Sequence, residues 1–124
     1  MIAPVNRIIV FVANVEVSAA FFEHAFELNR VQETYTAGQW LELQAGGCKL
    51  AFHKAYGKEG PIDEPTGGPD HPFKIVFYAE NIPEMKKKLE RKGVRMGEIK
   101  QFGNLAFCDG VGPENHPFQI SNRP

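Results

Sequence analysis

The feature that most constrains this fold is an internal duplication, because the chain repeats one short pattern 67 residues further on. Residues 9–15 read IVFVANV and residues 76–82 read VFYAENI, so each copy is an apolar run followed by an asparagine and another apolar residue. The same offset places Arg7 over Lys74. A solenoid needs three or more stacked repeats. Two half-length copies predict instead two modules packed face to face around a shared cleft.

The composition is that of a soluble globular protein, with 124 residues of which 43% are hydrophobic and 23% charged. A net charge of -1 argues against a nucleic-acid partner. No apolar run approaches the ~20 residues of a membrane span, and Pro4 and Asn6 interrupt any signal-peptide core. Cys48 and Cys108 form neither a CxxC motif nor a disulfide framework. We therefore expect a reduced, cytoplasmic protein.

The first module is predicted as βαβββ over residues 5–54. A buried strand at 7–12 leads to an amphipathic helix that Asn14 or Ser18 can cap, and short strands follow at 31–35, 39–44 and 49–53. Alternation assigns the sheet faces. The side chains expected to meet the helix are Leu41, Leu43, Leu50 and Phe52. Those expected on the opposite face are Trp40, Glu42, Lys49, Ala51 and His53.

A connection at 55–72, rich in Gly and Pro and without periodicity, separates the modules. A linker and a lid over a site are both open for it. The second module, residues 73–122, is predicted as a strand at 73–79, a helix at 82–91 and strands near 94–99, 104–108 and 118–121. Pro83 suits the first turn of that helix, and Gly93 suits its end.

Two stretches carry a resemblance to a known family. The run 8–22, IIVFVANVEVSAAFF, is similar to the opening of the vicinal oxygen chelate superfamily, and the ending 109–120, DGVGPENHPFQI, resembles its closing strand signature. That superfamily includes glyoxalase I, bleomycin-resistance proteins, fosfomycin-resistance enzymes and extradiol dioxygenases. The resemblance implies one α+β domain over residues 1–124, with two βαβββ modules forming a cup-shaped mixed sheet and the helices outside. It also implies a homodimer.

The resemblance further implies where a metal would bind. Its four strand positions, typically His or Gln, Glu, His and Glu, fall here on Arg7, Ala51, Lys74 and Gln119. Arg and protonated Lys have no lone pair to offer a cation, and Ala has no donor atom. A divalent metal needs three or four converging N, O or S ligands. We therefore expect neither a metal nor another cofactor.

The same face assignment predicts a binding site instead. Arg7, Lys74, His53 and Gln119 would make the cup basic and rich in hydrogen-bonding groups, which suits a carboxylate or a phosphate. The aromatic wall would come from Phe11, Trp40 and Tyr78. The alternative is that Arg7 and Lys74 pair with Glu42 and close a polar core.

Three functions follow from these observations. The preferred one is metal-independent binding of a small anionic molecule, as in the sequestering bleomycin-resistance proteins. The second is a metal-dependent lyase, isomerase or dioxygenase that uses a shifted set of ligands; that set is His53, His71, His116 and Gln119. The third is a degenerate module that acts only as a dimer or interaction partner. Whether any catalysis remains is left open.

Overall fold

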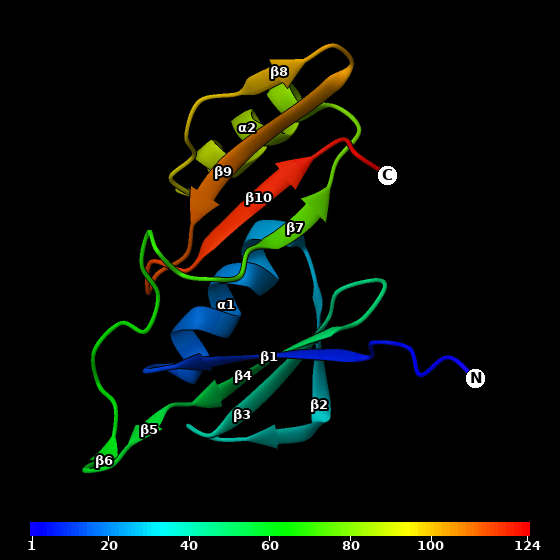
Figure 1. Cartoon of the computed structure of the whole chain (residues 1–124). Helices are drawn as coiled ribbons and strands as arrows, with labels where there is room; N and C mark the ends of the chain where they lie inside the picture. The colour runs from blue at the N-terminus through cyan, green and yellow to red at the C-terminus, as the bar shows by residue number, and fades with distance from the viewer. The chain divides into compact units, whose positions relative to one another are not determined.

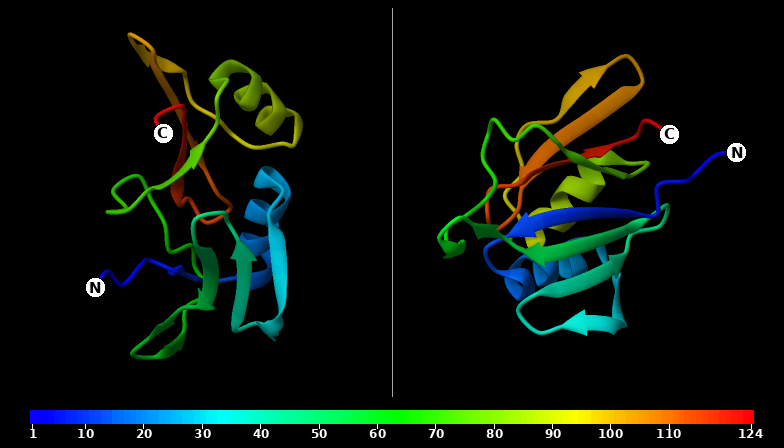
Figure 2. Two further views of the ribbon diagram at one scale, coloured as in Figure 1. Left: turned by 90° about the vertical axis from the view of Figure 1, so that its right-hand side faces the viewer. Right: turned by 60° about the horizontal axis from the view of Figure 1, so that its bottom comes forward.

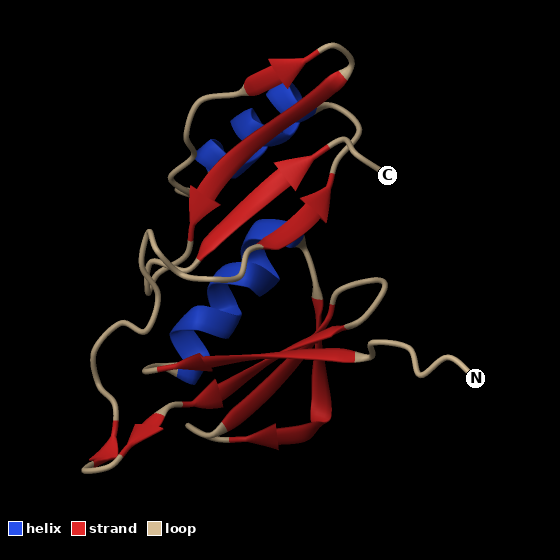
Figure 3. Ribbon diagram, in the orientation of Figure 1, coloured by secondary structure: helices blue, strands red, loops and turns tan.

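The computed structural model describes all residues 1–124, and the chain divides into two compact units, 1–66 and 67–124. Figure 1 labels their elements, and Figure 3 distinguishes helices from strands. The elements of the first unit are β1 (Arg7–Val12), α1 (Val15–Phe26), β2 (Asn29–Thr36), β3 (Trp40–Gln44), β4 (Lys49–Lys54), β5 (Tyr56–Gly57) and β6 (Gly60–Pro61). Those of the second unit are β7 (Ile75–Tyr78), α2 (Ile82–Arg91), β8 (Lys100–Phe102), β9 (Leu105–Val111) and β10 (Pro117–Ser121). The predicted α+β class and the two βαβββ modules are confirmed.

The two units share one sheet topology. The strand order is β1-β4-β3-β2 in the first unit and β7-β10-β9-β8 in the second. In each, the strand before the helix pairs in parallel with the last strand of the module, and the other neighbours are antiparallel. A parallel pair needs a crossover connection, which α1 and α2 supply. The duplication in the sequence is therefore a duplication of topology, and β1 and β7 both lie at sheet edges.

Matching caps begin the two helices. The side chain of Asn14 accepts a hydrogen bond from the Val17 amide at 3.0 Å, and Asn81 accepts one from the Glu84 amide at 3.0 Å. Each bond satisfies one of the amides that a helix leaves without a partner at its start. The cap of α1 is thus Asn14, and Ser18 is instead buried within the helix.

In the first unit, α1 covers one face of the sheet (Figure 2). Phe22 on α1 stacks on Phe52 of β4, with ring centroids 5.6 Å apart. The four side chains predicted to meet the helix are all buried, at 1% exposure or less: Leu41, Leu43, Leu50 and Phe52. The other face of this sheet, called the open face below, carries Ile9 and Phe11, which are 44% and 55% exposed.

The second unit repeats this arrangement, with one difference from prediction. Ile82 and Leu89 on α2 are buried, and α2 contacts β9 and β10. Its second strand, β8, begins at Lys100 instead of near residue 94. Between these positions the backbone contacts β9 through a bridge from Met96 to Gly110, a hydrogen bond from the Gly97 amide to the Asp109 carbonyl and one from the Cys108 thiol to the Gly97 carbonyl.

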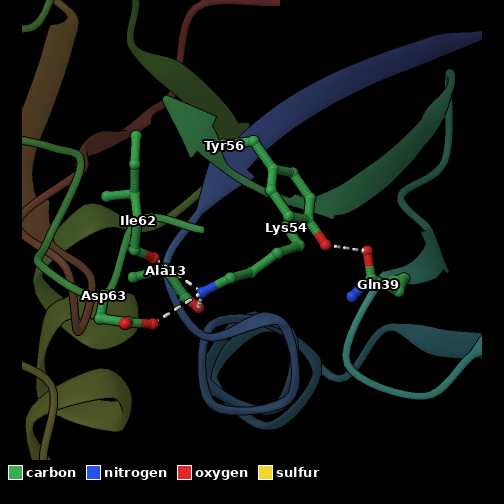
Figure 4. Close-up of polar contacts among 6 residues, drawn as sticks. All are labelled: Ala13, Gln39, Lys54, Tyr56, Ile62 and Asp63. Atoms are coloured by element: carbon green, nitrogen blue, oxygen red, sulfur yellow. Dashed lines mark hydrogen bonds and ion pairs between the residues drawn. The ribbon is translucent and has the colours of Figure 1, made fainter. Parts of the chain in front are cut away.

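The predicted connection is not wholly irregular, because it contains the β5–β6 hairpin. Figure 4 shows how side chains hold it. Nζ of Lys54 donates to the carbonyl oxygens of Ala13 and Ile62, both at 2.7 Å, and the Tyr56 hydroxyl donates to Oε1 of Gln39 at 2.7 Å. Sequence periodicity could not reveal this hairpin, since each strand is two residues long.

Neither α1 nor α2 is long and apolar enough to cross a membrane.

Candidate functional site

A buried carboxylate organises the open face of the first unit. Glu42, on β3, is 1% exposed. Nε of Arg7 donates to its Oε2 at 2.5 Å, and Oγ1 of Thr34 donates to its Oε1 at 2.8 Å. Burial of an unpaired carboxylate would be costly, so these charge-assisted and neutral donors are what allow it to remain ionised.

The pKa of Glu42 reflects this competition. Burial raises the pKa, because the charged form loses water. Hydrogen bonds from Arg7, Thr34 and Trp40, together with the positive charge of Arg7, lower it by more. The net result is a pKa below the ordinary value, so Glu42 is ionised at neutral pH.

Three rings flank this ion pair on the open face. The guanidinium carbon of Arg7 lies 6.0 Å from the centroid of the Trp40 ring. The Trp40 and His53 centroids are 5.8 Å apart with the rings at 89°, and those of Phe11 and His53 are 5.3 Å apart at 47°. Both ring pairs are direct cross-strand partners, Trp40 with His53 and Phe11 with His53. The first unit therefore brings together five of the eight predicted site residues.

The other three predicted site residues, Lys74, Tyr78 and Gln119, lie at corresponding positions of the second unit. Nζ of Lys74 lies 3.2 Å from Oδ1 of Asp109, and Nε2 of Gln119 donates to the same oxygen at 3.0 Å. Tyr78 is 61% exposed. Of the alternative in which Arg7 and Lys74 both pair with Glu42, the structure has the Arg7 pair, whereas Lys74 pairs with Asp109 of its own unit.

Sequence reasoning missed two residues of these sets, Asp109 and Thr34. A signal for Asp109 was available, because the 67-residue offset that aligns Arg7 with Lys74 also aligns Glu42 with Asp109. The strand registers agree, since Glu42 pairs with Ala51 as Asp109 pairs with Gln119. Thr34 had no comparable signal, because a register shift between Val31 and Thr36 breaks the alternation there.

The positions that the resemblance assigns to a metal hold other contacts. Arg7 and Lys74 each pair with a carboxylate, Ala51 is completely buried, and Gln119 donates to Asp109. No group of three or more His, Cys, Asp or Glu side chains is arranged to hold a metal.

The shifted set of ligands is divided between the units. His53 belongs to the first unit and the other three members to the second. His71 and His116 contact each other, with ring centroids 5.2 Å apart. Burial and then the nearby His71 lower the pKa of His116, against a smaller opposing effect of Glu114.

A separate hollow of about 430 Å³ lies where α1 begins and is lined in part by Asn14, Glu16, Lys54 and Asp63. None of the predicted site residues lines it. The ammonium group of Lys54 is already engaged there, with Ala13, Ile62 and Asp63 (Figure 4). These contacts fasten the hairpin and leave the lysine no hydrogen for a ligand.

A family model for the Glyoxalase/Bleomycin resistance protein/Dioxygenase superfamily matches residues 5–103. This confirms the resemblance seen in the sequence. No curated protein matches the chain significantly.

Solved structures with the same fold are similar over nearly the whole chain. A lactoylglutathione lyase from Agrobacterium tumefaciens has a TM-score of 0.73 at 14% identity, with 98% of this chain and 94% of that chain covered. TnmS3, an antibiotic binding protein from Streptomyces sp. CB03234, has a TM-score of 0.71 at 14% identity, with 96% and 94% covered. A possible glyoxalase from Bacillus cereus has a TM-score of 0.71 at 17% identity, with 96% and 98% covered. At these identities the likeness establishes the fold alone.

The two ion pairs predict a difference in stability. Replacing Glu42 by Gln should lower the free energy of unfolding at pH 7 by about 1.5–3 kcal/mol, because a buried charge-assisted hydrogen bond is weakened. The equivalent change Asp109→Asn should cost under about 1 kcal/mol, since Lys74 and Asp109 are 40% and 43% exposed. Urea unfolding followed by circular dichroism measures both values, and equal losses would contradict the prediction.

The ion pair of Arg7 and Glu42 also predicts how the free energy of unfolding depends on pH. The pKa of Glu42 is lower in the folded than in the unfolded chain, so its contribution is present above the unfolded value near 4.5 and is lost as pH falls through the folded value. The free energies of unfolding of the wild type and Glu42→Gln should therefore converge below about pH 4.5. A difference in the free energy of unfolding between the two proteins that stays constant from pH 7 to pH 3 would contradict the lowered pKa of Glu42.

Proposed function

Because the chain belongs to the Glyoxalase/Bleomycin resistance protein/Dioxygenase superfamily, we propose that it is a metal-independent binding protein for a small, ring-containing anion. The observation that carries this proposal is the row formed by Arg7, Trp40 and His53 on the open face of the first unit. A flat apolar surface flanked by a few convergent polar groups is typical of small-molecule sites.

Glu42 orients Arg7 but does not use all of its hydrogen-bond donors. Its Nε donates to the carboxylate, and its two terminal amino groups make no hydrogen bond within the chain. Paired amino groups of a guanidinium match the two oxygens of a carboxylate. Since Glu42 already neutralises the charge of Arg7, affinity would come from these hydrogen bonds and from burial of the ligand ring against Trp40, with only a small net Coulomb term.

The second unit carries a corresponding set of its own. Lys74 and Gln119 share Asp109 as an acceptor, and the exposed ring of Tyr78 occupies the place that Phe11 has in the first unit. This set is more exposed than the first and has no buried carboxylate, so we assign the principal contacts to Arg7, Phe11 and Trp40.

The relatives support two classes of function. TnmS3 is described as an antibiotic binding protein, which favours binding, whereas the lactoylglutathione lyase favours an enzyme. A metal-dependent lyase, isomerase or dioxygenase remains the alternative. The chemistry of the side chains argues for binding, because Arg7, Ala51 and Lys74 offer no lone pair at the positions that would hold the metal.

We also propose a symmetric homodimer, because β1 and β7 are edge strands with exposed apolar side chains beside them. Ile8 and Val76 are 41% and 55% exposed. Such edges need cover to avoid indiscriminate pairing. The cytoplasm is the proposed location, consistent with free thiols at Cys48 and Cys108.

A metal test separates the two functions. The purified protein should contain no stoichiometric Zn, Ni, Fe or Mn by elemental analysis. Added metal should leave its melting temperature nearly unchanged, because only a ligand that binds the native state stabilises it by mass action. A clear rise with one metal at micromolar concentration would overturn metal independence.

A ligand test probes the row directly. Naphthalene-2-carboxylate, a flat aromatic anion, should shift the indole N–H resonance of Trp40, which is unambiguous because the chain has one tryptophan. Arg7→Ala should weaken binding by about tenfold or more, the equivalent of ~1.4 kcal/mol. Arg91→Ala, which removes an exposed cation on α2, is the control and should leave affinity unchanged. Equal affinities for the wild type and Arg7→Ala would contradict the proposal.

The dimer is tested by light scattering at high micromolar concentration. The expected mass is twice 13.9 kDa. A monomer under these conditions would contradict the proposed dimer and would not affect the interpretation of the ligand test.

A further inference from the structure

The ring of His53 has a fixed tautomer. Its Nδ1 lies 2.7 Å from the carbonyl oxygen of Lys54. A carbonyl oxygen has no hydrogen to donate, so Nδ1 must carry the proton in this contact. In the neutral ring Nε2 then carries a lone pair, and no hydrogen bond within the chain engages it.

The lone pair belongs to a ring that has little freedom to turn. Phe11 and Trp40 contact His53 from the two neighbouring strands, and His53 is half-buried between them. The bond to Lys54 restrains the ring further. An acceptor whose direction is set in advance can discriminate between ligands, because its partner pays little entropy to meet it.

The duplication shows that this acceptor is particular to the first unit. Strand register places Ser121 where the first unit has His53, and Phe107 where it has Trp40. Ser121 is 4% exposed and its Oγ accepts a hydrogen bond from the Arg123 amide at 3.1 Å. The two units thus share the cation and the carboxylate but differ at the acceptor.

We infer that the open face of the first unit selects ring-containing anions that also bear an O–H or N–H group, which donates a hydrogen bond to Nε2 of His53 while Arg7 holds the acidic group. This inference rests on the proposed binding function and assigns its specificity to His53. Trp40 lies close to both recognition groups, with its ring centroid 6.0 Å from the Arg7 guanidinium carbon and 5.8 Å from the centroid of the His53 ring. A ligand ring lying on Trp40 would therefore be near both groups.

A matched series of probes tests this selection. Naphthalene-2-carboxylate is compared with its hydroxy derivatives at the 5, 6 and 7 positions and with the corresponding methoxy derivatives, which keep the oxygen but cannot donate. At least one hydroxy isomer should bind the wild type about tenfold more tightly than the parent acid, and its methoxy partner should lose that gain. If every hydroxy isomer binds no better than its methoxy partner, the inference fails.

Substitution of His53 by Phe keeps an aromatic ring between Phe11 and Trp40 and removes the acceptor. In His53→Phe the preference for the hydroxy isomer over its methoxy partner should vanish, because the variant has no acceptor at this position. The two probes are compared within the same variant, so a change in its affinity for the parent acid does not affect the result. A preference that survives in His53→Phe would assign the donor group to another acceptor and overturn the inference.

A measurement on the wild type needs no variant. Nitrogen chemical shifts of the neutral His53 ring should identify Nδ1 as protonated and Nε2 as the lone-pair nitrogen; the reverse tautomer would also overturn the inference. The failure of the binding proposal looks different. In that case neither the parent acid nor any derivative would bind the wild type, whatever the tautomer of His53.

Discussion

The site depends on one interaction, the ion pair between the buried carboxylate of Glu42 and Arg7. Arg7 lies on the edge strand β1 and Glu42 on β3, with β4 between them. The β4 residue that pairs with Glu42 is Ala51, and its methyl group leaves room for the arginine side chain to cross. Thr34 approaches from β2, so one carboxylate connects three strands of the sheet. The buried charge of Glu42 would be costly without partners, and its hydrogen bonds to Arg7 and Thr34 fix the side chains of the open face.

The duplication explains why the second unit has the same chemistry in a weaker form. Lys74, Gln119 and Asp109 occupy the positions of Arg7, Ala51 and Glu42. Gln119 has a longer side chain than Ala51, and its amide donates to the same oxygen of Asp109 that the lysine contacts. Lysine offers a point charge and no planar fork, and this pair is exposed to water, which screens it. The first unit has the more restrained recognition groups for this reason.

Much of this architecture could be predicted from sequence, because it follows from period and repetition. Alternation placed Leu41 and Trp40 on opposite faces, and the repeated Asn-apolar pair marked where both helices begin. Partners within the site were harder to predict, since an ion pair joins residues that are 35 positions apart in both units. The role of Thr34 could not be predicted because the irregular register of β2 breaks the alternation of its side chains. The β5–β6 hairpin gives no periodic signal because each of its strands is two residues long.

The lack of a donor atom at Ala51 and the pairing of Arg7 with Glu42 are physically connected. A carboxylate on the middle strand needs a cation wherever burial removes its water, and either a metal ion or a guanidinium can serve. A metal requires donors at several positions at once, whereas Arg7 requires only space, which Ala51 provides. With Arg7 in place, its positive charge would repel a second cation brought to Glu42. A side chain with a lone pair at residue 51 alone would therefore not create a metal site, because the carboxylate already has its counter-ion.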